Sequence, residues 1–292
     1  MKKRNVQSVI SIAVTIVYYL CIAGIGYVFF LIFLLASFKI PSNSMAPEVI
    51  AGDYVLVPKP LIGARLFNLF KMTADEPPNI YRLPGLRSIS RNDMLVFNFP
   101  CPKDWNRIEM GLMSYYIKRC IGMPGDTLSI DNGYYKVKGV DAPLGHIVSQ
   151  QAVSKRMDDT FEEGLFRSFP YDSVIDWNIK SFGPLYIPTK KAVVPMTRTH
   201  YVLYKKLIEW EQQAALSYRD SIVYLNGKPL HAYCFQKNYY FMAGDRVEDS
   251  QDSRYWGLLP EEYIVGKACL VWKSVDPYTG KFRWDRFLKR IN

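Results

Sequence analysis

Residues 40–47 have the sequence IPSNSMAP and stand where a long apolar segment gives way to a polar chain. Two serines, Ser42 and Ser44, lie two residues apart between Pro41 and Pro47. Proline fixes its own φ and disfavours helix in the residue before it, so we expect a rigid extended loop. A loop of this kind can hold a hydroxyl group in one place, which raises the question of whether a base lies near it.

The segment before this loop carries no charged residue between positions 5 and 38. As a helix it would be about 51 Å long at ~1.5 Å per residue, whereas about 20 residues cross the hydrocarbon core of a bilayer. It is longer than the apolar part of a cleaved signal peptide, so residues 1–39 are interpreted as a cytoplasmic tip and a permanent single-pass anchor. The basic run 2–4, against Lys39 alone on the other side, predicts a cytoplasmic N-terminus. A buried core helix is the alternative.

The composition narrows the class of protein. The chain has 292 residues, 49% of them apolar, and a net charge of +10. Such a charge suits either nucleic acid or an anionic membrane, and the anchor favours membrane lipid over nucleic acid. The five cysteines form no CxxC pair and the three histidines no HExxH motif, so we expect no metal site and no cofactor. Free thiols are favoured over a disulfide, although an extracytoplasmic location would permit one.

From Gly52 onwards, short runs with a period of two residues alternate with turns, which is typical of antiparallel β structure. The segments 131–133 (DNG) and 226–227 (NG) are hairpin signals. The expected strands are residues 53–57, 94–99, 115–121, 127–130, 134–137, 222–225, 239–242 and 263–272. We predict a mainly β fold in which residues 40–138 and 221–292 form one antiparallel β domain.

Three stretches depart from this pattern. Residues 139–220 are predicted to form an inserted α/β subdomain, with a helix within 196–218 that places Leu203, Leu207 and Trp210 on one face. Residues 59–90 form either a loop that rests on lipid or a packed loop. Residues 281–290 (KFRWDRFLKR) form either an interfacial aromatic belt or a solvated basic tail.

Lys118 is the candidate base, because serine is a poor nucleophile unless a base activates it. Strand alternation places Tyr116, Lys118 and Cys120 on one face, with Arg119 on the other, solvated or paired. An unperturbed lysine titrates near 10.4, so a neutral amine at pH 7 costs about 4.6 kcal/mol. Full burial shifts a pKa by roughly 3–5 units, which is enough to offset most of this free-energy cost. An ordinary surface lysine is the alternative.

A third polar cluster lies in residues 244–257 (GDRVEDSQDSRYWG). Asp252 and Arg254 stand two apart and are predicted to form an ion pair. Ser250 is predicted to hydrogen-bond an amine. The alternative is a solvated charged turn, which the closing Tyr-Trp-Gly disfavours.

Four segments together resemble the conserved boxes of bacterial type I signal peptidases. They are residues 41–53, 91–97, 116–126 and 244–257, and they occur in the family's order after a membrane anchor. They cover about 15% of the chain, and as a set they are highly specific. The resemblance implies a mainly β fold with a second subdomain inserted between the lysine box and the last box.

The resemblance also implies a role for each candidate residue. Ser44 matches the nucleophile and Lys118 the general base, while Ser42 matches the residue that helps the Ser44 backbone N–H to hold the oxyanion. Ser250 matches a serine that orients the lysine, and Asp252 and Arg254 match a supporting ion pair.

Three positions differ from the family pattern. Asn43 stands where the family usually has glycine, and asparagine tolerates positive φ better than most residues. Arg246 and Val247 replace the family's Asn-Arg, which leaves the local support of that loop open.

The implied function is that of a serine endopeptidase which removes signal peptides from exported preproteins, with small residues at the first and third positions before the cut. The catalytic domain would lie on the extracytoplasmic side of the bacterial inner membrane. Two alternatives stay open at this point: a related Ser–Lys peptidase with a dedicated substrate such as a pilin, and a non-catalytic tethered module that binds preproteins or envelope partners.

Overall fold

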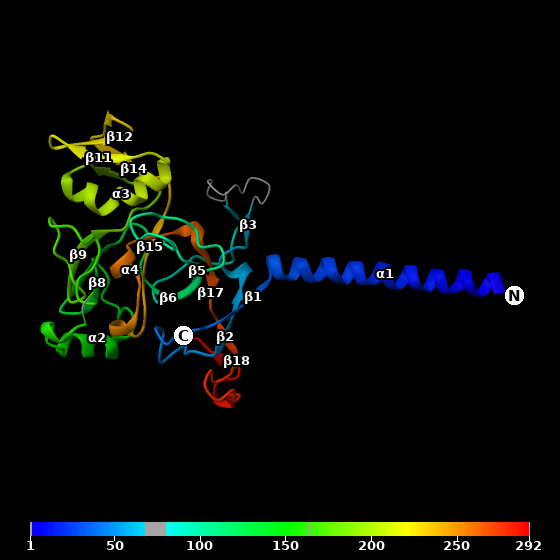
Figure 1. The fold of residues 1–292 in the computed structure, drawn as a ribbon. Coiled ribbons are helices and arrows are strands. Elements are labelled where there is room, and N and C mark those ends of the chain that lie inside the picture. The colour runs from blue at the N-terminus through cyan, green and yellow to red at the C-terminus, as the bar shows by residue number, and fades with distance from the viewer. Residues whose placement is uncertain (1, 68–79, 163, 292) are drawn as a thin grey trace.

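The computed structural model describes residues 2–67, 80–162 and 164–291. A long helix, α1 (Lys2–Phe33), projects from a body made mainly of antiparallel strands (Figure 1). The predicted mainly β fold behind an N-terminal apolar helix is therefore confirmed.

The helix α1 has the composition of a membrane span. Residues 10–33 have a mean hydropathy of 2.3, and the body of the protein buries none of them. The prediction that the anchor continues to residue 39 is wrong, because Leu35–Lys39 forms strand β1. This strand pairs with β2 (Asp53–Pro58) over its whole length. The last apolar residues thus join the sheet instead of extending the helix.

Two sheets form the centre of the body. A five-stranded sheet has the order β16-β15-β6-β5-β17, and a four-stranded sheet has the order β1-β2-β18-β19. Their strands, beyond β1 and β2, are β5 (Met94–Asn98), β6 (Tyr115–Gly122), β15 (Tyr239–Ala243), β16 (Leu259–Pro260), β17 (Ile264–Lys267), β18 (Leu270–Ser274) and β19 (Lys289–Arg290). The expected single strand 263–272 is in fact β17 and β18, one in each sheet, because the chain changes sheets at residues 268–269. Aliphatic side chains such as Val57, Val96 and Val271 share one buried cluster.

A third sheet, of order β8-β7-β9, lies on the far side of the body from α1 (Figure 1). It contains β7 (Thr127–Asp131), β8 (Tyr134–Val137) and β9 (Ser181–Tyr186), with α2 (Ile147–Lys155) packed beside it. The hairpin predicted at 131–133 is confirmed, since Asn132 and Gly133 have φ of 47° and 84°.

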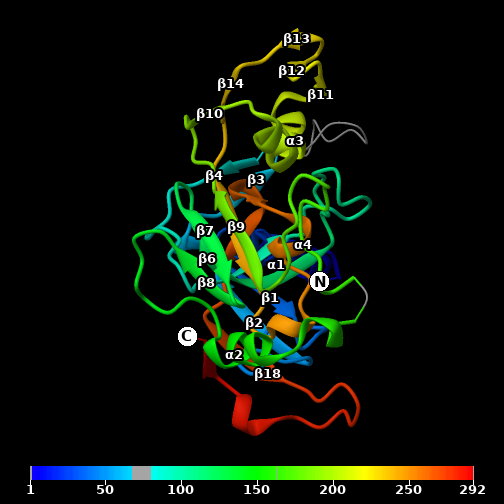
Figure 2. The same ribbon diagram turned by 90° about the vertical axis from the view of Figure 1, so that its left-hand side faces the viewer.

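A separate lobe stands at one end of the body (Figure 2). It comprises β10 (Val193–Pro195), α3 (Arg198–Gln212), β11 (Leu216–Arg219), β12 (Ile222–Leu225), β13 (Lys228–Pro229) and β14 (Ala232–Cys234). The predicted helix ends earlier than residue 218, because Gln213 adopts a left-handed conformation with φ of 48°. The predicted shared face of Leu203, Leu207 and Trp210 is confirmed: the two leucines are buried, and Trp210 is partly buried against the same core cluster. The predicted boundary between residues 220 and 221 falls inside the β11–β12 hairpin, between two paired strands.

The stretch 59–90 begins with a 3-10 turn, Lys59–Leu61, and continues as the hairpin β3 (Arg65–Phe67) and β4 (Ile80–Arg82). Residues 68–79, in the middle of the stretch predicted either to rest on lipid or to pack, lie outside the described residues. The remaining short helix is α4 (Ser253–Trp256), within the third polar cluster.

Candidate active site

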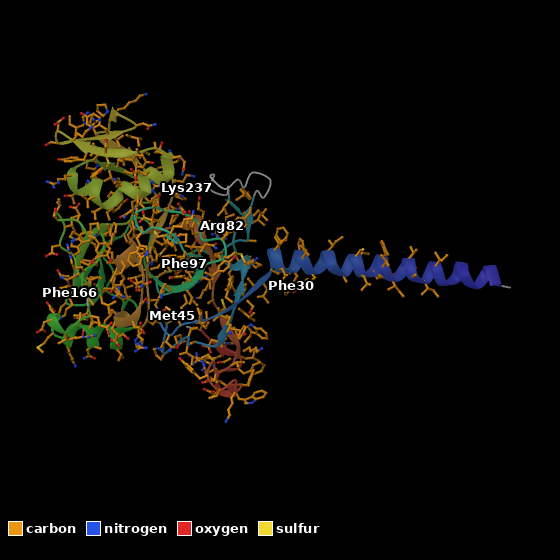
Figure 3. The ribbon with its side chains drawn as sticks, viewed as in Figure 1. Phe30, Met45, Arg82, Phe97, Phe166 and Lys237 are labelled. Atoms are coloured by element: carbon orange, nitrogen blue, oxygen red, sulfur yellow. The ribbon has the colours of Figure 1, made fainter. Side chains whose placement is uncertain are left out.

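The structure brings Ser44 and Lys118 together. The Lys118 Nζ lies 2.5 Å from the Ser44 Oγ, within hydrogen-bond distance. Ser44 belongs to the loop between β1 and β2, whereas Lys118 belongs to β6 in the other central sheet. In Figure 3 the neighbouring Met45 lies in the body of the protein, beyond β1 as seen from α1.

The backbone of the Ser44 loop is fixed by hydrogen bonds at three points. The N–H of Ala46 donates to the carbonyl of Asn43 at 2.9 Å, and the N–H of Arg246 donates to the carbonyl of Ser44 at 3.0 Å. Asn43 does not take the positive φ that its place in the motif suggested; its Oδ1 accepts the N–H of Ala51 instead, at 2.9 Å. The asparagine therefore supports the loop with its side chain.

Lys118 is almost completely buried, with 3% of its surface exposed. Burial lowers its pKa from 10.5 to about 8; the carboxylate of Asp252 opposes this change, and Arg254 adds to it. A neutral amine at pH 7 then costs about 1.4 kcal/mol instead of the 4.6 of a solvated lysine. The Lys118 amine is thus within reach of its neutral form at physiological pH.

Asp252 and Arg254 form the predicted ion pair, and both are fully buried. The guanidinium donates twice to the carboxylate, from Nε and from a terminal nitrogen, each at 2.8 Å. Burial alone would raise the pKa of Asp252, but Arg254 overcomes this and the pKa lies below its usual value. Asp252 also accepts the N–H of Gly244 at 2.8 Å, which ties the ion pair to the end of β15.

Ser250 lies beside Gly244 but does not make the predicted hydrogen bond to an amine. Its hydroxyl is buried and forms no hydrogen bond to Lys118 or to any other group among the described residues. It packs against Gly244 instead: a Cβ added to that glycine would lie 2.1 Å from Ser250 Oγ and 2.8 Å from the Ser44 carbonyl oxygen. Only glycine fits here, because the serine and the nucleophile loop approach from both sides.

Ser42 is exposed beside Ser44. Neither its hydroxyl nor the backbone N–H of Ser44 makes a hydrogen bond within the described residues. No contact within the described residues tests the oxyanion assignment, so the role of Ser42 stays a prediction.

One ion pair at the site had been assigned no role from the sequence. Arg119 follows Lys118 directly and donates to both carboxylate oxygens of Asp245 at 2.7 Å, and to the Asn92 carbonyl at 2.8 Å. Asp245 is 1% exposed. The pair links β6 to the chain segment whose next residue, Arg246, holds the Ser44 carbonyl. The only sequence signal for this ion pair was the presence of its two residues in the motifs, in the dipeptides Lys-Arg (118–119) and Gly-Asp (244–245).

The C-terminal segment 281–290 also contacts the loop, so the alternative of a solvated basic tail is wrong for Arg286 and Lys289, whereas Lys281 and Arg290 are exposed. Arg286 donates to both oxygens of the buried Asp53, at 2.9 and 2.5 Å. Lys289 donates to the Glu48 carbonyl at 2.9 Å. The side chains of Arg286 and Lys289 turn inward because carboxylate and carbonyl oxygens of residues 48–53 face them.

Comparisons with known proteins agree with these motifs. The family model described as signal peptidase, peptidase S26, matches residues 9–273. The chain is 27% identical to the signal peptidase I of Buchnera aphidicola subsp. Schizaphis graminum, covering 90% of this chain and 77% of the relative. It is 28% identical to the signal peptidase I of Buchnera aphidicola subsp. Acyrthosiphon pisum, covering 84% of this chain and 70% of the relative. It is also 27% identical to the signal peptidase I of Pseudomonas aeruginosa, covering 83% and 66%.

Proposed function

The chain belongs to the signal peptidase family, peptidase S26, and we propose that Ser44 and Lys118 are the nucleophile and the general base of its reaction. Membership makes it a membrane-anchored serine endopeptidase that cleaves signal peptides from exported preproteins. The observation that carries the assignment of residues is the 2.5 Å contact between Lys118 Nζ and Ser44 Oγ.

The reaction proceeds in two halves. The neutral amine of Lys118 takes the proton of the Ser44 hydroxyl while Oγ forms a bond to the scissile carbonyl carbon. The Ser44 N–H and the Ser42 hydroxyl donate to the oxyanion. Lys118 then gives its proton to the leaving amine as the C–N bond breaks. A water attacks the acyl-enzyme, Lys118 takes its proton, and the proton returns to Ser44 as the ester bond breaks.

The supporting residues hold these two groups in contact. The buried pair Asp252–Arg254 fixes the end of β15 through Gly244, and Ser250 fills the space beside that glycine. In this proposal Ser250 positions the nucleophile loop by packing. Its effect on Lys118 is therefore indirect.

The orientation in the membrane follows from charge. The basic run 2–4 stays in the cytoplasm, and the β domain lies on the extracytoplasmic side of the bacterial inner membrane. Membrane lipid, and no nucleic acid, is then the second partner beside the preprotein.

A direct test incubates the detergent-solubilised protein with a labelled preprotein and maps the cut by mass spectrometry. We expect one cut after a small residue, and a rate that falls by at least about 10⁴-fold in Ser44→Ala. Ser181→Ala, an exposed serine on β9, is the matched control and keeps the wild-type rate. Wild-type processing by Ser44→Ala would refute the assignment.

A further inference from the structure

The junction between the membrane helix and the β domain contains no flexible linker. Only Leu34 separates the end of α1 from the start of β1. The amine of Lys59 donates to the carbonyls of Leu31 and Ile32, at 2.6 and 3.1 Å, and its backbone N–H donates to the Leu34 carbonyl at 2.9 Å. The last carbonyls of a helix lack partners within the helix, and a lysine near them is favourable. Lys59 therefore caps the helix and binds it to the domain.

Strand β1 continues this connection to the nucleophile. It pairs with β2 from Leu35, opposite Pro58, to Lys39, opposite Tyr54. Trp272 of β18 reaches across and donates its indole N–H to Ser37 at 2.8 Å. At one end of the β1–β2 pair stands the capped helix, and at the other the loop that carries Ser44. Five residues of strand between them span about 17 Å.

We propose that the β1–β2 pair, held to α1 by Lys59, sets the distance of Ser44 from the membrane and so selects which peptide bond of a membrane-held preprotein is cut. Lys59 is a positioning residue in this proposal, which rests on the proposed function above. The apolar part of the preprotein lies in the same bilayer as α1. In an extended substrate, each successive peptide bond lies about 3.3 Å farther from the membrane. A rigid junction therefore favours one bond, whereas a loose junction reaches several.

The test uses a preprotein with three successive cleavable bonds beyond its apolar segment, reconstituted with the enzyme in phosphatidylethanolamine–phosphatidylglycerol vesicles. Mass spectrometry gives the share of each cut. Two variants loosen the junction: Lys59→Met, and an insertion of four Gly/Ser residues between Phe33 and Leu34. Lys39→Met is the control, because it removes a charge at an exposed position of β1. The Lys39 side chain makes no hydrogen bond within the described residues. A soluble peptide containing one of the bonds measures the catalytic site alone.

We expect the wild type and Lys39→Met to cut mainly one bond. In both loosened variants the ratio of the main product to its neighbours should fall about threefold to tenfold, because a looser junction lets Ser44 reach the neighbouring bonds; this range matches the net free energy of a typical hydrogen bond. The soluble peptide should be cut at the wild-type rate throughout. An unchanged distribution in the insertion variant, which leaves Lys59 intact and keeps peptide cleavage, would overturn the proposal. Failure of the wild type to cut the peptide would instead overturn the proposed function.

Discussion

Two lysines are buried in the described part of the chain, and they differ in what their amines touch. Lys118 lies in β6 and Lys206 in α3, with 3% and 8% of their surfaces exposed. Burial lowers the pKa of both. The Lys206 amine donates to the backbone carbonyls of Trp105, at 3.2 Å, and Trp256, and lies 5.2 Å from the centre of the Phe169 ring. The Lys118 amine contacts the hydroxyl of Ser44.

The difference shows that burial alone does not make a lysine a base. A carbonyl oxygen only accepts hydrogen bonds, so the partners of Lys206 favour an amine that keeps all its protons. A hydroxyl also donates, so Ser44 can give its proton to a neutral Lys118. A lowered pKa therefore identifies a buried amine, and the partner decides whether that amine performs chemistry or joins two elements.

The largest expected effect comes from Lys118→Met. We expect cleavage of a soluble peptide to fall at least about 10⁴-fold, since the base is lost. Thermal unfolding should nevertheless occur at the same or a higher temperature. The folded protein disfavours the charged amine, and the pKa change from 10.5 to about 8 corresponds to about 3 kcal/mol at neutral pH. The hydrogen bond to Ser44 offsets about 1 kcal/mol of this. A Lys118→Met variant that is clearly less stable than the wild type would show that Lys118 stabilises the fold, as Lys206 is expected to do.

The second effect is the pH dependence of cleavage. Because the reactive form is the neutral amine with a pKa of about 8, kcat/KM should rise about tenfold per pH unit below 8 and level off above it. Between about 8 and 10.5 the unfolded chain still binds the proton that folded Lys118 has lost, so its contribution to stability rises with pH. Initial rates on a soluble peptide from pH 5 to 10 measure the profile. A flat profile below 8 would show that another group is the base.

Sequence patterns identified Lys118 but gave no sign of Lys206. Lys118 stands at a defined place in a strand, between Tyr116 and Cys120, within a recognisable motif. Lys206 stands beside Lys205 in a charged helix, and its partners are backbone carbonyls that any residue supplies. The resemblance of the motifs thus predicted the Ser44–Lys118 pair, whereas no motif marked the buried lysine in α3.

The other differences have similar causes. The apolar composition of residues 35–39 fits a helix or a strand equally well, and pairing with β2 decided for the strand. Ser250 was expected to bond an amine, but its contact with Gly244 depends on close packing that sequence does not express. The inward turn of Arg286 required the position of Asp53, which lies 233 residues away.

The smallest expected effect on cleavage comes from Lys206→Met. This change leaves the buried Trp256 carbonyl without the donor that joins α3 to α4, so we expect a loss of about 1–3 kcal/mol in the free energy of unfolding. Cleavage per folded molecule should stay within about threefold, with an unchanged pH profile, because the Lys206 amine contacts neither Ser44 nor Lys118. Lys205→Met, at the exposed neighbouring lysine, is the control for lost charge and should leave stability within about 0.5 kcal/mol. Urea unfolding and peptide cleavage on the same samples measure both quantities. If Lys206→Met lost activity but kept its full stability, Lys206 would take part in catalysis, and the assignment of a purely structural role from its carbonyl partners would be wrong.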